Sequence, residues 1–434
     1  MQTLRATGSD AAVQEMLRIF KENRAGGQRG IYSVCSAHQL VLEAAIAQAA
    51  RDESLLLIEA TCNQVNQEGG YTGLTPERFC DYVRALAREV GFPEERLILG
   101  GDHLGPNPWR SASSNAAMEK ACAMVKAYAS AGFAKIHLDA SMACADDFGG
   151  LTNVEIAQRT ARLCEAAEAA AAERLFAPVY IIGTEVPPPG GAKGELEVEV
   201  TETSSVQNTL DLHRAAFEER GLSSVWERVV GVVVQPGVEF GDLSVADYVP
   251  ERAARLSEWL AGVERIVFEA HSTDYQTGKS LEHLVRDHFA ILKVGPELTF
   301  SLREAIFGLA GIEEEWISDS KRSDTRVVLD RVMVDHPENW KAYYHGDSHH
   351  QRIARAYSQS DRIRYYWPHP DISAAVSLLT QNLAANPAPL PVIEQYLPYE
   401  AEAIRREEIA NTPHAILLCH IQRTLARYAR ACGF

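Results

Sequence analysis

The sequence predicts a (β/α)8 barrel, the TIM-barrel fold, with a mostly helical C-terminal extension. Three observations lead to this fold class. Short apolar runs alternate with helical stretches rich in Ala, Glu and Arg, eight such runs can be counted, and polar residues end nearly every run. The alternation is typical of βα repeats, and a barrel carries its functional side chains at the carboxyl ends of its strands.

The eight runs have the near-continuous Val, Ile and Leu content of parallel strands that are covered on both faces. Most stretches between them are long enough to hold a crossover helix. The runs lie at residues 30–38, 54–65, 96–106, 133–141, 179–186, 229–240, 265–274 and 288–300. An open doubly wound sheet is the alternative, but no G-x-G-x-x-G follows the first run, and the polar strand ends favour a barrel.

The strand pattern stops after residue 300. Residues 301–434 have the pattern of helices, with an aromatic patch, RIRYYWPHP, from Arg362 to Pro370. We therefore divide the chain into a barrel at 1–300 and a helical extension at 301–434. Because no Gly/Ser-rich linker separates the two parts, we expect the extension to pack on the barrel.

Composition excludes several classes of partner. The 434 residues include 59 acidic and 42 basic residues, for a net charge of −17. Nucleic acids and anionic membranes both select a basic surface, so we expect neither as a partner. No run of eighteen apolar residues and no secretory signal is present, which favours a cytoplasmic protein. The eight cysteines form no C-x-x-C pair and suit reduced core thiols, although Cys35 and Cys62 lie near strand ends and leave a reactive thiol open.

A candidate metal site comes from three strand ends. Asp102 and His103 leave the third run in GGDHLGPN, His271 follows the seventh in FEAHSTD, and Glu185 follows the fifth in IIGTEV. Two histidines and a carboxylate around an open position form a sound catalytic zinc set, so we assign His103, Glu185 and His271 as metal ligands. Asp102 is then free to exchange a proton. The alternative for the first pair is a helix-capping Asp beside a surface His.

The fourth run ends in KIHLDASM, where His137 and Asp139 face the same side of the strand because side-chain direction repeats every two residues. Only one of them needs to reach a substrate. We favour Asp139, nearer the carboxyl end, as a second catalytic residue and assign His137 to the barrel core.

Substrate contacts are expected from three further segments. Hydroxyls and backbone amides at Ser272, Thr273 and Asp274 could hold an anion, and the turn at Gly295 opens a helix where barrels often bind phosphate. Asn63 and Gln64, in the polar loop NQVNQEGGYTG, suit sugar hydroxyls, although the same composition marks any flexible loop.

These motifs together resemble a known family. SVCSAH, NQVNQEGGYTG, ILGGDHLGPN, KIHLDASM, VVQPGVEF, EAHSTDYQT and DRIRYYWPH are similar to the larger subunit of class II tagatose-1,6-bisphosphate aldolase, over nearly the whole chain. In the wider class II aldolases an Asp-His pair ends the third strand, matched here by Asp102 and His103, and the histidine of an H-G-[AG]-S-D motif resembles His271. Glu185 stands near the position where the catalytic subunits have a histidine.

The resemblance implies a zinc-dependent TIM barrel of sugar metabolism that supports a smaller catalytic subunit, with a phosphorylated ketose or sugar acid as substrate, and we expect an oligomer. The alternatives are a stand-alone metal-dependent sugar or sugar-acid epimerase or aldolase, and an interaction protein without metal. Members of this family also bear the label tagatose 6-phosphate kinase. We disfavour kinase activity, because the sequence has no G-x-x-x-x-G-K-[ST] and no protein-kinase signature set.

Overall fold

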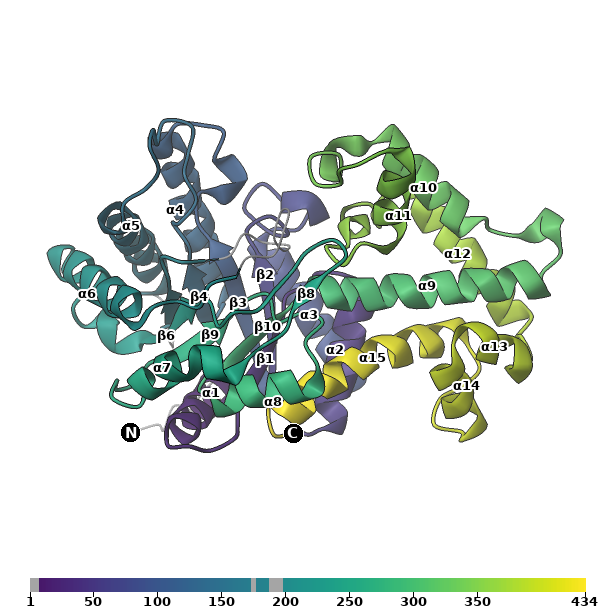
Figure 1. Ribbon diagram of the computed structural model, residues 1–434, viewed down its shortest axis with the longest axis horizontal. Coiled ribbons are helices and arrows are strands. Elements are labelled where there is room, and N and C mark those ends of the chain that lie inside the picture. Colours follow the sequence, from purple (N-terminus) through teal and green to yellow (C-terminus); the bar gives the residue numbers. More distant parts are fainter. Residues whose placement is uncertain (1–7, 173–176, 187–197) are drawn as a thin grey trace.

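The computed structural model describes residues 8–172, 177–186 and 198–434, and its centre is a closed barrel of eight parallel strands (Figure 1). The strands are β1 (Ile31–Val34), β2 (Leu56–Thr61), β3 (Leu97–Leu104), β4 (Lys135–Leu138), β5 (Val179–Ile182), β6 (Val229–Val234), β9 (Val267–Ala270) and β10 (Ile291–Val294). A short antiparallel pair, β7 (Glu239–Phe240) and β8 (Val245–Ala246), forms a separate sheet. The predicted fold class is confirmed, and each barrel strand lies within one of the eight predicted runs.

Helices follow the barrel strands in the order of a (β/α)8 fold. They are α2 (Gln39–Arg51), α3 (Pro76–Val90), α4 (Ser114–Ala131), α5 (Asn153–Ala171), α6 (Thr203–Glu219), α7 (Pro250–Leu260) and α8 (Gly278–Arg286). Before them, α1 (Gly8–Arg24) packs its apolar face on strand residues such as Leu57, Ile98 and Ile291, which covers the amino end of the barrel (Figure 1). None of the helices in the described residues is long and apolar enough to cross a membrane.

The last helix of the chain completes the barrel wall. After β10, α9 (Pro296–Trp316) leaves the barrel, and α15 (Pro413–Ala431) returns beside it (Figure 1). α15 packs against α8, α9 and α2, which is the place of the eighth outer helix in a regular barrel. Between α9 and α15 lie α10 (Thr325–Asp335), α11 (Ser348–Tyr357), the short η7 (Arg362–Tyr365), α12 (Pro370–Ala385), α13 (Leu390–Tyr396) and α14 (Pro398–Arg405). Residue 300, the proposed domain boundary, falls inside α9.

The interior of the barrel is layered because strand side chains alternate in direction. Its lower layer is apolar and includes Leu57, Val267 and Ile291. Two residues further along the same strands stand Glu59, Glu269 and Lys293, all buried. Polar groups therefore begin halfway up the barrel and continue to its carboxyl end.

Candidate metal centre and active site

Three imidazoles meet at the carboxyl end of the barrel. His103 lies near the end of β3, His137 lies on β4, and His271 follows β9. The ring centroids of His103 and His137 are 5.2 Å apart, those of His103 and His271 4.8 Å, and those of His137 and His271 5.1 Å. Imidazoles that share one zinc ion at Zn–N distances near 2.0 Å have centroids about 5 Å apart. The triangle therefore has the size of a three-histidine metal site.

Each of these histidines contacts a carboxylate with one ring nitrogen. The pairs are His103 Nδ1 with Asp139 Oδ2 at 2.8 Å, His137 Nδ1 with Asp102 Oδ1 at 3.0 Å, and His271 Nε2 with Glu269 Oε1 at 3.0 Å. A carboxylate in this position orients the ring, and the other nitrogen remains for a metal. The Nε2 atom of His137 is buried and has no hydrogen-bond partner among the described residues. The residues present thus fit a metal ion.

A second grouping overlaps with the histidine triangle. Ligand atoms of Asp102, His137, Glu269 and His271 all lie within 4.8 Å of one another. Carboxylate oxygen and imidazole nitrogen are both ligands of zinc. His137 and His271 belong to both groupings, so these two histidines are the most direct test of metal binding.

The pKa values of His271 and His103 are shifted in opposite directions. Burial lowers the pKa of His271 to about 4, so this ring is neutral at pH 7 and its free nitrogen has a lone pair for a metal. Burial also lowers the pKa of His103, but Asp102 and Asp139 outweigh this and raise it above its usual value. Burial raises the pKa of Asp102, yet His103 and Lys293 outweigh burial and hold it well below its usual range. Asp102 is therefore ionised.

A layer of buried charges lies beneath the histidines. Lys135 Nζ is 2.7 Å from Glu59 Oε1 and 2.6 Å from Glu269 Oε2. Lys293 Nζ pairs with Glu59 and lies 2.9 Å from Asp102 Oδ1. Gly100 makes room for this layer, because a Cβ there would stand 2.5 Å from Glu59 Oε1. Through Asp102 and Glu269, the charge layer supports the carboxylates that contact His137 and His271.

Backbone strain occurs at two of these strand ends. His103 and Ser272 have φ values of 50° and 55°, in the left-handed region that non-glycine residues rarely adopt. Such strain persists where the surrounding structure holds it, and it clusters at functional sites. At His103, within the last residues of β3, the strained backbone places the ring between Asp139 and His271.

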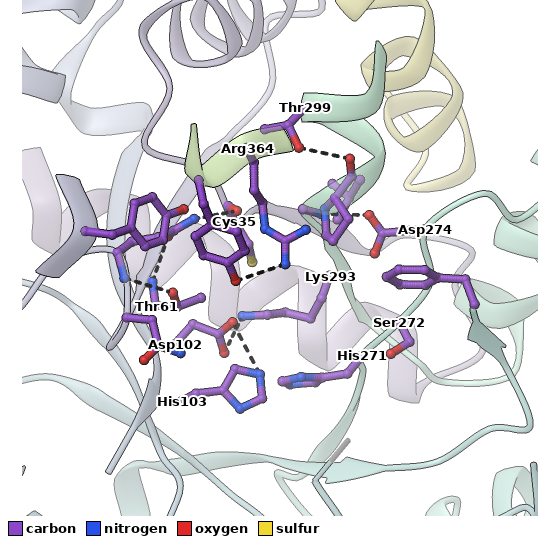
Figure 2. Close-up of a pocket in the computed structure, with 18 residues that line it drawn as sticks. Cys35, Thr61, Asp102, His103, His271, Ser272, Asp274, Lys293, Thr299 and Arg364 are labelled. Atoms are coloured by element: carbon purple, nitrogen blue, oxygen red, sulfur yellow. Dashed lines mark hydrogen bonds and ion pairs between the residues drawn. The ribbon is translucent and has the colours of Figure 1, made fainter. Parts of the chain in front are cut away.

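One pocket opens above this centre, and Figure 2 shows the side chains that line it. Among the residues predicted from the sequence, those that line the pocket are Asn63, Gln64, Asp102, His103, His271, Ser272, Asp274 and Gly295. The side chain of Gln64 is already engaged, because Oε1 accepts from the Thr61 amide at 2.9 Å and Nε2 donates to the Cys35 carbonyl at 3.2 Å. Asp139 does not line the pocket and instead supports His103.

Glu185 is not brought to the centre. β5 ends at Ile182, the chain bends at residues 184–185, and the Glu185 side chain is exposed. The bend breaks the alternation that would have turned this side chain inward. The carboxylates near the histidines are Asp102, Asp139 and Glu269 instead.

The expected anion site after β9 and β10 is occupied by a side chain of the protein itself. Asp274 Oδ1 accepts from the backbone amides of Gly295 and Glu297 at 2.9 Å each, so a carboxylate already takes the place that a phosphate would take at the start of α9. Thr273 is fully buried and donates to the Lys293 carbonyl at 2.7 Å. Ser272 and Asp274 both line the pocket, but only Asp274 accepts hydrogen bonds from these amides.

Several members of the centre were not predicted from the sequence. His137 is fully buried, as expected of a core residue, but it contacts Asp102 and belongs to the metal grouping. Glu269 and Lys293 were missed, although each is a charged residue inside an apolar run. Cys35 lines the pocket, but burial raises the pKa of its thiol and that of Cys62 well above the usual range, which disfavours a reactive thiolate.

Comparison with known proteins identifies the family. The model of the D-tagatose-1,6-bisphosphate aldolase subunit GatZ/KbaZ-like family matches residues 16–433. The chain belongs to this family. It is therefore a TIM-barrel protein related to tagatose-bisphosphate aldolase, and its GatZ/KbaZ-like relatives are described as subunits of that enzyme.

One solved structure is a close match over nearly the whole chain. A protein from Sinorhizobium meliloti 1021, described as a probable tagatose 6 phosphate kinase, is 49% identical, with a TM-score of 0.86 over 93% of this chain and 100% of its own. Fructose-bisphosphate aldolase from Campylobacter jejuni is 13% identical, with a TM-score of 0.45 over 87% of this chain and 92% of its own. The YdjI aldolase from Escherichia coli K12 is 11% identical, with a TM-score of 0.42 over 84% and 96%. The last two likenesses are too weak to support a conclusion.

Proposed function

We propose that this GatZ/KbaZ-like chain is the larger subunit of a class II tagatose-1,6-bisphosphate aldolase, that it acts with a smaller catalytic subunit, and that it holds a zinc ion of its own. The observation that carries the proposal is the triangle of buried imidazoles, each with a carboxylate on one ring nitrogen. A subunit that served only as a scaffold would not need this arrangement. Its substrate class would be a phosphorylated ketose.

His137 and His271, with His103 or the carboxylates beside them, would hold the metal. When bound, zinc polarises a sugar carbonyl and stabilises an enediolate. Asp102 is ionised, buried and at the pocket wall, so it is placed to take a proton from the substrate and return it. His103 and Lys293 keep Asp102 ionised, and Asp139 orients His103.

Metal content tests this proposal directly. The purified chain is loaded with zinc, dialysed and analysed for bound metal. We expect about one zinc per chain, and we expect His137→Ala and His271→Ala each to lose it. His213→Gln is a matched control, because His213 is another fully buried histidine that lies on α6 rather than at the pocket. A wild-type chain without zinc, or variants that keep it, would contradict a metal centre.

A stand-alone epimerase is the second candidate. It is favoured by the completeness of the site, since the histidines, the carboxylates and Lys293 all come from one chain. Assays of aldol cleavage and of ketose isomer formation, with and without the smaller aldolase subunit, separate the two candidates. Activity that requires the smaller subunit supports the subunit role, whereas isomer formation by the chain alone supports an epimerase.

We do not propose kinase activity, although the relative from Sinorhizobium meliloti is described as a probable kinase. No nucleotide-binding motif is present in the sequence. ATP-dependent phosphorylation of tagatose 6-phosphate that is unaffected by His271→Ala would overturn this view.

A further inference from the structure

An arginine from the C-terminal part of the chain reaches the mouth of the barrel. Arg364 belongs to η7, between α11 and α12, yet it lines the same pocket as Asp102 and His271. In Figure 2 its side chain extends into the pocket from the side opposite His103 and His271. A segment far from the barrel strands in the sequence therefore places a cation across the pocket from the candidate metal centre.

No carboxylate of the described residues pairs directly with the Arg364 guanidinium, and Asp361, which acts on it through space, is itself paired with Arg303 at 2.9 Å. Across residues 8–172, 177–186 and 198–434, Arg364 forms no ion pair. Three of its five N–H groups donate to neutral oxygens, two from Nη1 to the carbonyls of Ser360 and Asp361 and one from Nη2 to the Tyr365 hydroxyl at 3.2 Å. Lys293, the other cation of the pocket wall, is paired with Glu59 and Asp102. Unlike Lys293, Arg364 therefore has no direct carboxylate partner among the described residues, and two of its N–H groups are available to a ligand.

Neighbouring aromatic rings hold this arginine in place. Its guanidinium carbon lies 4.7 Å from the centroid of the Tyr365 ring, and the Tyr71 ring packs edge-on against Tyr365 at 4.9 Å. A stacked guanidinium has less freedom to lose when it binds a ligand. This preorganisation suits recognition of an oxyanion, for which arginine offers paired donors.

Other anion sites in the pocket are closed. The first amides of α9 are occupied by Asp274, and Lys293 is committed to carboxylates. A sugar that brought a phosphate or carboxylate to the histidine end of the pocket would meet Asp102, which lines that end and is held ionised. The favourable place for that anion is beside Arg364, with the rest of the sugar chain directed toward the histidines.

We propose that Arg364 is the anchor for the terminal anionic group of an open-chain sugar whose carbonyl end faces His103, His137 and His271. The inference deepens the proposed function, on which its choice of a sugar substrate rests. The recognised chemistry is an oxyanion remote from the carbonyl, which either a phosphorylated ketose or a sugar acid supplies. The C-terminal segment would then select for an anionic sugar over a neutral one.

Calorimetric titration of the full-length, metal-free chain tests the anchor without any turnover. The probes are tagatose 6-phosphate, tagaturonate and uncharged tagatose. Arg364→Met should weaken binding of the preferred anionic sugar by about 10- to 100-fold and leave tagatose binding unchanged, since it removes a charge-assisted hydrogen bond. Arg364→Lys should fall between, because it keeps the charge and loses the paired donors. The preferred probe decides between phosphate and carboxylate.

Arg405→Met is the matched control, because Arg405 is also in the C-terminal part but its side chain is 70% exposed on α14. It should bind all three probes like the wild type. Equal affinity of Arg364→Met and wild type for both anionic sugars would overturn the proposal, as would equal weakening for tagatose or no binding of either anionic sugar to the wild type. Zinc content, measured separately, reports on the metal centre, so a chain without zinc that still needs Arg364 would refute only the proposed function.

Discussion

Replacing Lys135 with methionine should destabilise the protein and weaken its metal site together. Lys135 is completely buried inside the barrel and lies between two carboxylates, 2.7 Å from Glu59 and 2.6 Å from Glu269. Methionine is close to lysine in length but has no charge, so Lys135→Met would leave two carboxylates without one of their counter-ions. Glu269 also contacts His271, which links this charge layer to the candidate ligands.

The magnitude follows from the burial of the network. Removing one partner of a buried ion pair typically costs about 3–5 kcal/mol, because the remaining charge has lost both water and its partner. We therefore expect Lys135→Met to lower the free energy of unfolding by about 3–5 kcal/mol, measured by urea denaturation. Because Glu269 supports His271, zinc affinity should fall about 10- to 100-fold, as is usual when a group that orients a metal ligand is disturbed.

Two further variants make this reasoning refutable. Lys120→Met is a control at a half-exposed lysine that pairs with Glu68 at 2.8 Å, and a surface pair of this kind should contribute little. Adding Glu59→Gln to Lys135→Met removes one of the two carboxylates that have lost Lys135, so the double variant should lose less stability than the sum of the two single losses. Strict additivity, or a cost of Lys135→Met below about 1 kcal/mol, would show that these charges do not depend on one another.

Three other outcomes are expected. Asp102→Ala should still bind zinc at saturating metal, with an affinity lowered about 10- to 100-fold because Asp102 orients His137, while turnover falls about 10²–10⁴-fold; complete loss of zinc in this variant would make Asp102 a ligand instead. Burial lowers the pKa of His213 to about 4, so the unfolded chain takes up a proton first as the pH falls below about 6.5, and stability is lost at about 1.4 kcal/mol per pH unit. At pH 5 this loss reaches about 2 kcal/mol, and His213→Gln should be spared it in urea denaturation at pH 7 and pH 5. A chain truncated after Phe300 should be insoluble or melt at a much lower temperature, whereas unchanged melting and oligomeric size would contradict the role given to α15.

The barrel could be predicted because its signal is local and repeated. Each strand lies within an apolar run, and a parallel strand covered on both faces has to be apolar along most of its length. The eighth outer helix could not be predicted in this way. It is α15, and only packing against α2 and α8 distinguishes it from the other helices of the C-terminal part.

The candidate site was partly predictable for the same reason. Asp102, His103 and His271 stand at strand ends, where a barrel gathers its functional side chains, and all three line the pocket. Glu185 occupies an equivalent position in the sequence, but it lies in the bend after β5 and its side chain is exposed, and a bend of this kind has no clear signature in one sequence.

The layer of buried charges could have been predicted from a pattern in the sequence. Four apolar runs each contain one internal charge, Glu59 in LLIEAT, Lys135 in AKIHL, Glu269 in VFEAH and Lys293 in ILKVG. A charge inside a strand that is covered on both faces must be paired, and two lysines with two glutamates can pair with one another. Because side-chain direction in a strand repeats every two residues, Lys135 and His137 point to the same side, as do Glu269 and His271. A search for charged residues inside the strands would therefore have identified His137 as well.

The chain after β10 both closes the barrel wall and carries Arg364 to the pocket. α9 carries the chain away from the barrel, and α15 brings it back to close the wall between α8 and α2. The segment between them is therefore held at both ends by helices that pack on each other, and η7 is held further by Tyr71 of the β2 loop against Tyr365. A cation supplied from a segment fixed in this way keeps its distance from the histidines. Under the two proposals above, this excursion would set the length of the sugar that fits between Arg364 and the candidate metal centre, while the eight strands would supply the chemistry at the sugar's other end.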